Sequence, residues 1–224
     1  FEGHRTINSE GYVEARAALS DGFGKMLEIH ENSIYDIFHN VVGKLCIFRD
    51  VTVERDLEKQ ILHSSNTDFL TGLYNRRYFY QYIHGSRGNK SVSLLYIDLD
   101  WFKAVNDTYG HKVGDAVLTG TARTLVESFP NDFVARLGGD EFLVARLGEC
   151  SVEQLEKEAG EFLAKLNARF QASREMSSLS ASIGIAQGTD SHMDIDLLIQ
   201  HSDQALYQAK KEGRSRYCVY REQE

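Results

Sequence analysis

The chain has 224 residues and a formal net charge of −8, and 42% of its residues are hydrophobic and 26% charged. This length accommodates one full domain and a smaller module, whereas the acidic charge argues against nucleic-acid binding, which relies on a basic surface. No apolar run approaches the roughly 20 residues that span a bilayer, so we expect no membrane contact from these residues.

The start of the chain and its cysteines indicate its cellular setting. The chain opens at Phe1 without an initiator methionine or a signal segment, so we expect a piece of a longer protein that could carry a membrane anchor upstream. The three cysteines, Cys46, Cys150 and Cys218, are far apart and in no metal-ligand spacing. Reduced thiols are therefore favoured, which suits a cytoplasmic domain.

Residues 1–52 are predicted to begin with a helix and to continue with two β-rich runs, 25–38 and 41–48. A turn is predicted between the two runs at 40–43, and alternating apolar residues give each run one hydrophobic face. Because about fifty residues are too few for a complete sensor domain, we interpret this segment as the back half of one.

Residues 53–67 are predicted to form a linker helix. Val53, Leu57 and Ile61 recur every four residues among charged side chains, a pattern that is typical of a short amphipathic helix. The pattern is too short to establish a coiled coil. Two interpretations therefore stand: a connector that pairs with its copy in a dimer, and an ordinary surface helix.

Residues 68–224 alternate between strand and helix patterns. The predicted strands are 91–97, 133–136, 142–145, 179–185 and 217–220. The predicted helices lie around 113–125, 155–170 and 195–209. The second of these helices opens with a capping box from Ser151 to Gln154. The sum is an α+β domain in which a mostly antiparallel sheet carries helices.

One predicted strand ends in two carboxylates, Asp98 and Asp100, which are two residues apart and therefore project to one side of the sheet. Carboxylates at a strand end are a usual way to hold Mg²⁺, which prefers oxygen ligands and keeps positions open for substrate phosphates. The alternative is a strand exit with solvated acids.

A second acidic segment follows a pair of glycines. Gly138 and Gly139 are predicted to form a tight hairpin turn, where the missing Cβ atoms let a ligand approach the backbone, and Asp140 and Glu141 follow. Alone, this is a turn followed by acids. If the hairpin lies beside the strand that ends at Asp98, its carboxylates converge on one metal, as two-metal phosphoryl transfer requires.

The third segment is a cationic group after the last predicted helix, made of Lys210, Lys211 and Arg214. Cations near a helix C-terminus are favourable in any protein. An acidic chain that handles a triphosphate nevertheless needs a local positive group of this kind.

Together these segments resemble the GGDEF family, whose members are usually diguanylate cyclases. The shared motifs, in chain order, are DFLTGLYNRR at 68–77, DLDWFKAVND at 98–107, GHKVGD at 110–115, GGDEF at 138–142, and ALYQAK followed by GR at 205–214. Five motifs in the right order are far more specific than one five-residue match.

The resemblance implies a fold like that of nucleotide cyclases and polymerase palm domains. The implied reaction condenses two GTP molecules into cyclic di-GMP and releases two pyrophosphates. Each subunit would hold one GTP, so the implied partner is a second copy in a homodimer of half-sites. The implied cofactor is Mg²⁺, with Mn²⁺ as a substitute.

The resemblance also assigns roles by position. Metal binding is implied for Asp98, the backbone carbonyl of Leu99, Asp140 and Glu141, and catalytic roles for Asp140, Glu141 and Lys103. Substrate contacts are implied for Phe102, Asn106, Asp115, Gly138, Gly139, Lys210 and Arg214. Asn106 and Asp115 would read guanine, because an Asp accepts from both N1–H and the 2-amino group, a donor pair that adenine lacks. The general base is left open between Glu141, a substrate phosphate and a metal-bound hydroxide.

The segment before the linker helix resembles the end of a PAS sensor domain. Residues 43–52, GKLCIFRDVT, are similar to its last strand and to the Asp-Val-Thr exit that leads into a signalling helix. The expected organisation is a PAS-like part at 1–52, a linker helix at 53–67 and a GGDEF domain at 68–224.

One departure from the family pattern concerns feedback. Many members carry an Arg-x-x-Asp product-inhibition site five residues before the signature, and here the positions are Phe129, Pro130, Asn131 and Asp132. Phe129 replaces the Arg that would make bidentate contacts. The hypothesis is that the usual feedback inhibition is absent.

Two alternatives to a cyclase of GTP remain. A non-catalytic GGDEF domain could bind GTP and regulate a partner, although such domains usually lose signature acids and none is lost here. A different nucleotide cyclase or hybrid dinucleotide synthase is the other alternative, and Asp115 at the guanine-reading position argues against it.

Overall fold

The computed structural model describes residues 5–7, 13–18, 24–86, 88, 90–188 and 194–221. The chain divides into two compact units, Phe1–Ser65 and Asn66–Glu224, and each is described here by itself. No helix in the described ranges is both long and apolar enough to cross a membrane.

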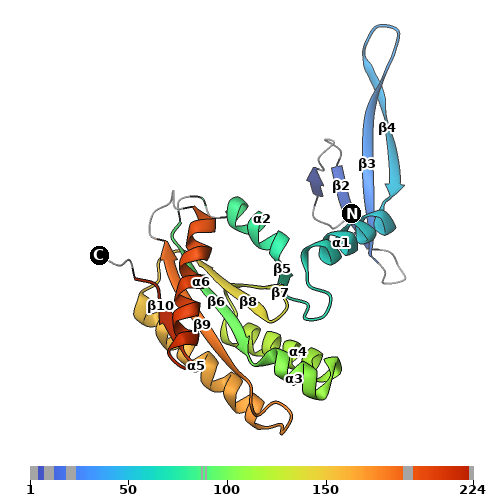
Figure 1. Ribbon diagram of the computed structural model, residues 1–224. Helices are drawn as coiled ribbons and strands as arrows, with labels where there is room; N and C mark the ends of the chain where they lie inside the picture. The colour runs from blue at the N-terminus through green and yellow to red at the C-terminus, as the bar shows by residue number, and fades with distance from the viewer. Residues whose placement is uncertain are drawn as a thin grey trace. The chain divides into compact units, whose positions relative to one another are not determined.

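The first unit is a four-stranded antiparallel sheet followed by a helix (Figure 1). Its strand order is β1 (Arg5–Ile7), β2 (Val13–Ala18), β3 (Gly24–Tyr35) and β4 (Val41–Asp50). The prediction of a helix at the start of the chain is wrong for the residues that the structure describes there, because β1 and β2 are strands. The sequence VEARAA of β2 favours a helix by propensity, but pairing of β2 with β3 overrides that preference.

The turn between β3 and β4 lies earlier than predicted. The Asp36 carboxylate accepts hydrogen bonds from the backbone N–H groups of Phe38 and Asn40, both at 2.8 Å, which is how an Asp side chain closes a turn. Val41 and Gly43 are already paired with β3. The prediction of a turn at 40–43 is therefore wrong by about one turn length.

The linker helix is present as α1 (Thr52–Asn66). The Asp50 carboxylate accepts hydrogen bonds from the backbone N–H and hydroxyl of Thr52 and forms an ion pair with Lys25 at 2.6 Å. These contacts hold the pKa of Asp50 at about 2. They also fix the point at which the strand passes into the helix. Val53, Leu57 and Ile61 all lie exposed on α1.

The second unit is a six-stranded sheet with helices on both faces, which confirms the predicted α+β class (Figure 1). The strand order is β10 (Tyr217–Val219), β9 (Ser180–Gly188), β6 (Val92–Asp100), β8 (Glu141–Leu147), β7 (Phe133–Gly138) and β5 (Tyr74–Asn75). The four central strands pair antiparallel, and the two short edge strands pair parallel.

Two hydrophobic cores, one on each face, support this sheet. One core lies against α3 (Phe102–Tyr109), α4 (His111–Ser128) and α5 (Val152–Gln171), and the other against α2 (Arg76–Ser86) and α6 (Ile195–Lys211). The N-cap half of the predicted capping box is present, since the Ser151 hydroxyl accepts from the Gln154 N–H at 3.2 Å, whereas the Gln154 side chain donates to Glu158.

Alternation along β6 decides on which face its terminal acids lie. Leu95, Ile97 and Leu99 enter the α3–α5 core, whereas Leu94 and Tyr96 enter the α2–α6 core. Because side chains alternate along a strand, the acids that continue the second series, 98 and 100, face α6.

Helix α6 reaches the sheet closely enough to bring its C-terminal end to these acids. A Cβ added at Gly184 of β9 would lie 1.9 Å from the Ser202 carbonyl oxygen of α6. Glycine at 184 therefore permits a backbone-to-backbone approach that no larger residue allows.

Candidate active site

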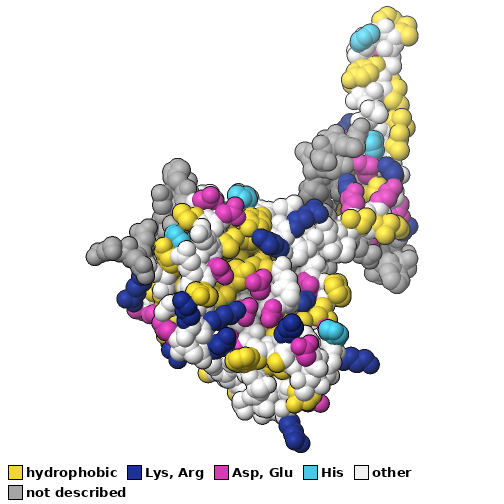
Figure 2. Space-filling model, viewed as in Figure 1, with side chains coloured by type: hydrophobic (Ala, Val, Ile, Leu, Met, Phe, Trp, Pro, Cys, Tyr) yellow, Lys and Arg dark blue, Asp and Glu magenta, His cyan; other side chains and the backbone are white. Residues whose placement is uncertain are grey.

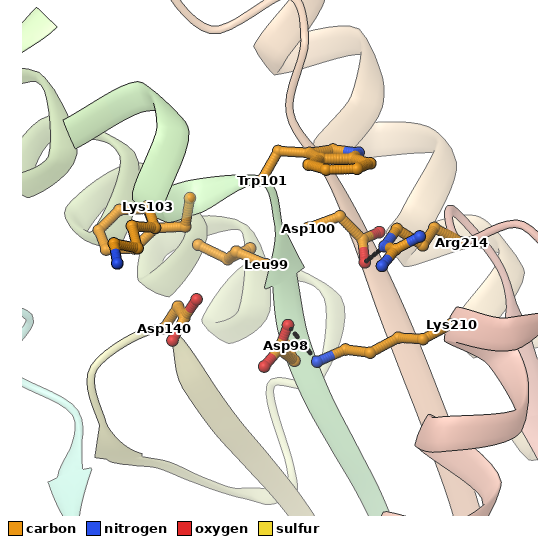
Figure 3. A pocket seen from close by; sticks show the side chains of 9 residues that line it. Asp98, Leu99, Asp100, Trp101, Lys103, Asp140, Lys210 and Arg214 are labelled. Carbon is orange, nitrogen blue, oxygen red and sulfur yellow. Dashed lines mark ion pairs between the residues drawn. The ribbon is translucent and has the colours of Figure 1, made fainter. Parts of the chain in front are cut away.

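The two strand-end carboxylates have different environments. Asp98 forms an ion pair with Lys210 of α6, with 2.8 Å between Oδ1 and Nζ. Asp100 is fully buried and accepts hydrogen bonds from the hydroxyls of Ser180 and Ser182 at 2.7 and 2.9 Å and from the Ser215 N–H at 3.2 Å. The ion pair with Lys210 engages one oxygen of Asp98, whose side chain faces the open pocket (Figure 3), whereas hydrogen bonds engage both oxygens of Asp100.

The glycine hairpin brings a second carboxylate to this place. Gly138 and Gly139 have φ of 148° and 53°, and residues with a side chain rarely adopt either value. The Leu99 N–H donates to the Asp140 carbonyl at 3.3 Å, which ties the hairpin to the end of β6. Figure 3 shows the side chains of Asp98 and Asp140 flanking the same space.

These groups line an open pocket of about 220 Å³. Its lining residues are Asp98, Leu99, Asp100, Trp101, Phe102, Lys103, Asp140, Lys210 and Arg214 (Figure 3). Seven of the predicted site residues are therefore brought together: all of this set except Asp100 and Trp101.

The predicted guanine-reading residues lie beside this pocket, outside its lining. Asn106 of α3 packs against Gly114 of α4, where an added Cβ would lie 1.9 Å from Asn106 Oδ1. That oxygen is buried and has no hydrogen-bond partner. The next residue, Asp115, is exposed. The tight α3–α4 contact thus brings Asn106 of α3 against Gly114 of α4, the residue before Asp115.

Glu141 is also outside the pocket lining. It stands opposite Asp98 in the ladder between β6 and β8 and accepts a hydrogen bond from the Tyr96 hydroxyl. Burial, followed by the charge of Glu141, raises the pKa of Tyr96 far above its usual value. Tyr96 therefore stays a hydrogen-bond donor that orients Glu141 next to the metal-binding candidates.

Burial and a neighbouring cation have opposite effects on the pKa of Asp98. Burial raises the pKa of the Asp98 carboxyl, the Lys210 ammonium opposes that rise, and the charges of Asp140 and Asp100 add to it. Acidic groups so placed repel one another in the absence of a cation. A cation bound between Asp98 and Asp140 would relieve this repulsion.

The protein supplies only some of the ligands that a magnesium ion needs. Within the described ranges, no three His, Cys, Asp or Glu side chains gather closely enough to hold a metal. Asp98 and Asp140 offer carboxylate oxygens, which are hard donors, in one pocket that Leu99 also lines. Mg²⁺ is commonly bound by one or two carboxylates with waters and substrate phosphates completing its shell, so this donor set suits a substrate-dependent site.

Sequence reasoning missed the residue that holds the hairpin, Arg136. Its guanidinium donates twice to the Gly139 carbonyl, at 3.0 and 2.7 Å, and once to Asp68 at 2.9 Å. Asp68 also accepts from the N–H and hydroxyl of Thr71. Burial works against the ionised Asp68, but these hydrogen bonds keep its pKa below the usual value. The 68–77 motif was recognised, but no sequence signal paired it with Arg136.

The region of the feedback site is occupied by structural contacts. Phe129 is buried and packs against Phe162, with ring centroids 5.8 Å apart. Both oxygens of Asp132 accept from the Arg146 guanidinium, at 2.8 and 2.6 Å, and Arg146 also reaches Glu158. The remaining half of the motif is therefore already paired within the chain.

One pocket of this α+β sheet is lined by a strand-end acid, an acid on a glycine hairpin and two cations near a helix end. This arrangement defines the class of the domain, which is of the GGDEF type. The sequence profile described as "Diguanylate cyclase, GGDEF domain" matches residues 65–216. The chain belongs to this family.

Curated relatives agree with this assignment. The chain is 35% identical to diguanylate cyclase DgcM of Escherichia coli strain K12, covering 96% of this chain and 51% of the relative. It is 32% identical to a diguanylate cyclase of Vibrio cholerae, covering 94% and 67%. It is also 36% identical to the cyclic di-GMP phosphodiesterase PdeR of E. coli, covering 81% and only 28%. The chain thus spans between about a quarter and two thirds of these proteins.

Solved structures show the same fold. The coiled coil and GGDEF domain of DgcB from Caulobacter crescentus, solved in complex with c-di-GMP, matches with a TM-score of 0.66 at 26% identity, covering 75% of this chain and 93% of that one. Diguanylate cyclase SiaD of Pseudomonas aeruginosa, solved with its activator SiaC, matches with a TM-score of 0.60 at 30% identity, covering 75% and 66%.

Proposed function

We propose that this chain is a diguanylate cyclase, which condenses two GTP into cyclic di-GMP and releases two pyrophosphates. The observation that carries the proposal is the meeting of Asp98 and Asp140, from two separate motifs, in one pocket with Lys210 and Arg214. In each half of the reaction, a 3′-hydroxyl oxygen forms a bond to the α-phosphorus of the other GTP, and the bond to pyrophosphate breaks.

Mg²⁺ is the proposed cofactor, with Mn²⁺ as a substitute. Asp98, the Leu99 carbonyl and Asp140 would hold it, with Glu141 alongside. When bound, such an ion neutralises phosphate charge and lowers the pKa of an attacking hydroxyl. The Lys210 ammonium, which pairs with Asp98 in the protein alone, would be released to a substrate phosphate.

The proposed substrate contacts use residues in and around the same pocket. Lys103, Lys210 and Arg214 line the pocket as cations and would hold phosphate oxygens. Asn106, whose amide oxygen has no hydrogen-bond partner, and the exposed Asp115 would read the guanine edge. Phe102, which is mostly buried, would support the base and sugar from the core side. The open hairpin surface at Gly138 and Gly139, where an added Cβ would meet nothing within 4 Å, would admit the nucleotide.

The reaction needs two copies of the chain, because one pocket presents one GTP. We place the control of that encounter in the first unit, interpreted as the end of a PAS-like sensor, and in α1 as the dimer connector. The four-stranded antiparallel sheet, the Asp50 contacts that start α1 and the exposed apolar stripe of α1 support this part of the proposal.

Feedback inhibition of the usual kind is proposed to be absent. Phe129 belongs to the core and Asp132 is held by Arg146, so neither is available to a nucleotide. Calorimetry with cyclic di-GMP should show no tight binding. Tight binding that Asp132→Ala abolishes would overturn this.

The proposal is tested by incubating the full chain with Mg²⁺ and GTP and separating the nucleotides by chromatography. Cyclic di-GMP is expected from GTP, no cyclic dinucleotide is expected from ATP, and Asp140→Asn should abolish the product formed from GTP. The rival is a GGDEF domain that binds GTP and regulates a partner, since one matching relative is named as a phosphodiesterase. GTP that binds but remains intact would favour that rival, and a product formed from ATP would favour a different cyclase.

A further inference from the structure

Asp100 was recognised as half of a diacid pair, but the proposed reaction leaves it without a role. It is the more buried of the two acids, and both of its oxygens are engaged by Ser180, Ser182 and the Ser215 N–H. A buried carboxylate is costly unless it is paired and hydrogen-bonded. Here the carboxylate joins β9, through Ser180 and Ser182, to the turn at Ser215 that follows α6.

Asp100 holds the turn that carries Arg214. Four non-glycine residues among those described have a positive φ, and three of them meet here: Trp101 at 66°, Arg214 at 65° and Ser215 at 51°. Such conformations persist only where the surroundings impose them, and they gather at functional sites. The hydrogen bond from the Ser215 N–H to Asp100 and the Arg214 N–H to the Ala209 carbonyl at 3.0 Å impose this turn.

The Arg214 side chain is fixed from two further directions. Its Nε lies 3.8 Å from Asp100 Oδ1, and its guanidinium carbon lies 4.7 Å from the centroid of the Trp101 ring (Figure 3). Trp101 is 57% exposed although it is a large apolar residue. Its left-handed backbone presents the ring over the guanidinium, which is a favourable position for a cation.

We infer that Asp100 and Trp101 are positioning residues that hold the Arg214 guanidinium over the pocket, ready for a phosphate of GTP. This inference rests on the proposed function, in which Arg214 contacts that phosphate. Because folding already orders the long Arg214 side chain, substrate binding does not lose that conformational entropy. Neither residue needs to touch the substrate.

The first test uses the fact that Trp101 is the only tryptophan of the chain, so its emission reports on this contact alone. Arg214→Ala uncovers one face of the ring and should raise acrylamide quenching. Asp100→Asn should raise it similarly, with no further rise in the double variant. Glu127→Gln, an exposed acid outside the pocket, is the matched control and should leave quenching unchanged. Wild-type quenching in a folded Asp100→Asn would overturn the inference.

The second test changes the exposed ring, so it stands even if Asp100→Asn fails to fold. Affinity for α,β-methylene-GTP, an analogue that cannot release pyrophosphate, is measured by calorimetry with Mg²⁺. Trp101→Leu should bind it about two- to fivefold more weakly, the size of an exposed cation–π contact, and Trp101→Phe should recover most of the loss. In an Arg214→Ala background, the Trp101→Leu effect should vanish.

The outcomes separate this inference from the proposed function. If the wild-type chain does not bind the analogue, the proposed function fails, while the quenching test still decides whether Asp100 holds Arg214. If the wild-type chain binds it and Trp101→Leu binds equally well, the positioning inference fails alone. A Trp101→Leu loss that persists in the Arg214→Ala background also overturns it.

Discussion

Two of the antiparallel hairpins, β3–β4 and β7–β8, differ in how their turns are made. The β3–β4 hairpin turns on the side chain of Asp36 and leaves apolar residues in solvent, with Ile37 89% and Phe38 78% exposed; Figure 2 shows hydrophobic side chains along it. The β7–β8 hairpin turns on Gly138 and Gly139, is tied down by Arg136, and continues into a fully buried strand at Phe142 and Leu143.

This difference teaches where each hairpin can act. A turn closed by its own polar side chain leaves the strands' apolar surface for another partner. A glycine turn anchored from outside leaves a bare backbone and one carboxylate, Asp140, in a fixed place. The first hairpin has the properties of a contact surface, and the second those of a catalytic element.

The largest effect should come from the carboxylate of the anchored hairpin. Asp140→Asn keeps the shape but removes a negative charge next to Asp98. We expect cyclic di-GMP synthesis to fall by about a hundredfold or more, because metal stabilisation of a phosphoryl transition state is worth several kcal/mol. The rate is measured by product chromatography at saturating Mg²⁺ and GTP. Activity close to wild type would place the metal elsewhere.

The next effect should come from releasing the anchor. Arg136→Ala removes the hydrogen bonds to the Gly139 carbonyl and the ion pair with Asp68, in which the two side chains are mostly buried. We expect the free energy of unfolding to fall by about 1.5–3 kcal/mol. We also expect kcat to fall about tenfold, because Asp140 is misplaced. Urea unfolding and steady-state kinetics measure the two.

Arg136→Lys is the control for this change. It keeps the charge near Asp68 but lacks the fork that reaches Gly139, so stability should recover more than kcat does. If both recover fully, the guanidinium geometry has no role in holding the hairpin.

A smaller, pH-dependent effect is expected at Asp98. Its pKa is raised mainly by burial, so the folded chain binds more protons there than the unfolded chain, and stability falls as the pH rises through this raised pKa. Asp98→Asn removes that loss. In EDTA, the variant should therefore melt above wild type at about pH 7, and the gap should narrow toward about pH 4. A gap that is independent of pH would contradict this.

The smallest effect on folding should come from the free hairpin. Replacing both Ile37 and Phe38 by Ser removes exposed apolar side chains, so the unfolding free energy should stay within about 0.5 kcal/mol of wild type. Self-association, measured by analytical ultracentrifugation, should weaken instead. A large loss of stability would show that these residues pack within the chain.

The sequence predicted those parts of the site that depend on local pattern. The alternation of β6 placed Asp98 and Asp100 on one side, and the glycine pair predicted the turn that carries Asp140. The pattern left open whether the two segments meet, and the ladder that pairs Asp98 with Glu141 brings them together.

Contacts between segments far apart in the chain could not be predicted from the sequence. Asp100 is satisfied by Ser180, Ser182 and Ser215, about eighty and more than a hundred residues away, and serines carry no signal of such a role. Arg136 was overlooked for the same reason. The early helix prediction failed because strand pairing outweighs intrinsic propensity, and the β3–β4 turn because Asp36, rather than a glycine, makes it.

The most direct test of the account is the rate of cyclic di-GMP formation from GTP and Mg²⁺, measured against the concentration of the full chain. If two half-sites must meet, the rate per chain should rise with chain concentration before it levels off. Two pyrophosphates should be released for each cyclic di-GMP. GTP that binds but yields no cyclic di-GMP at any concentration would contradict the central claim.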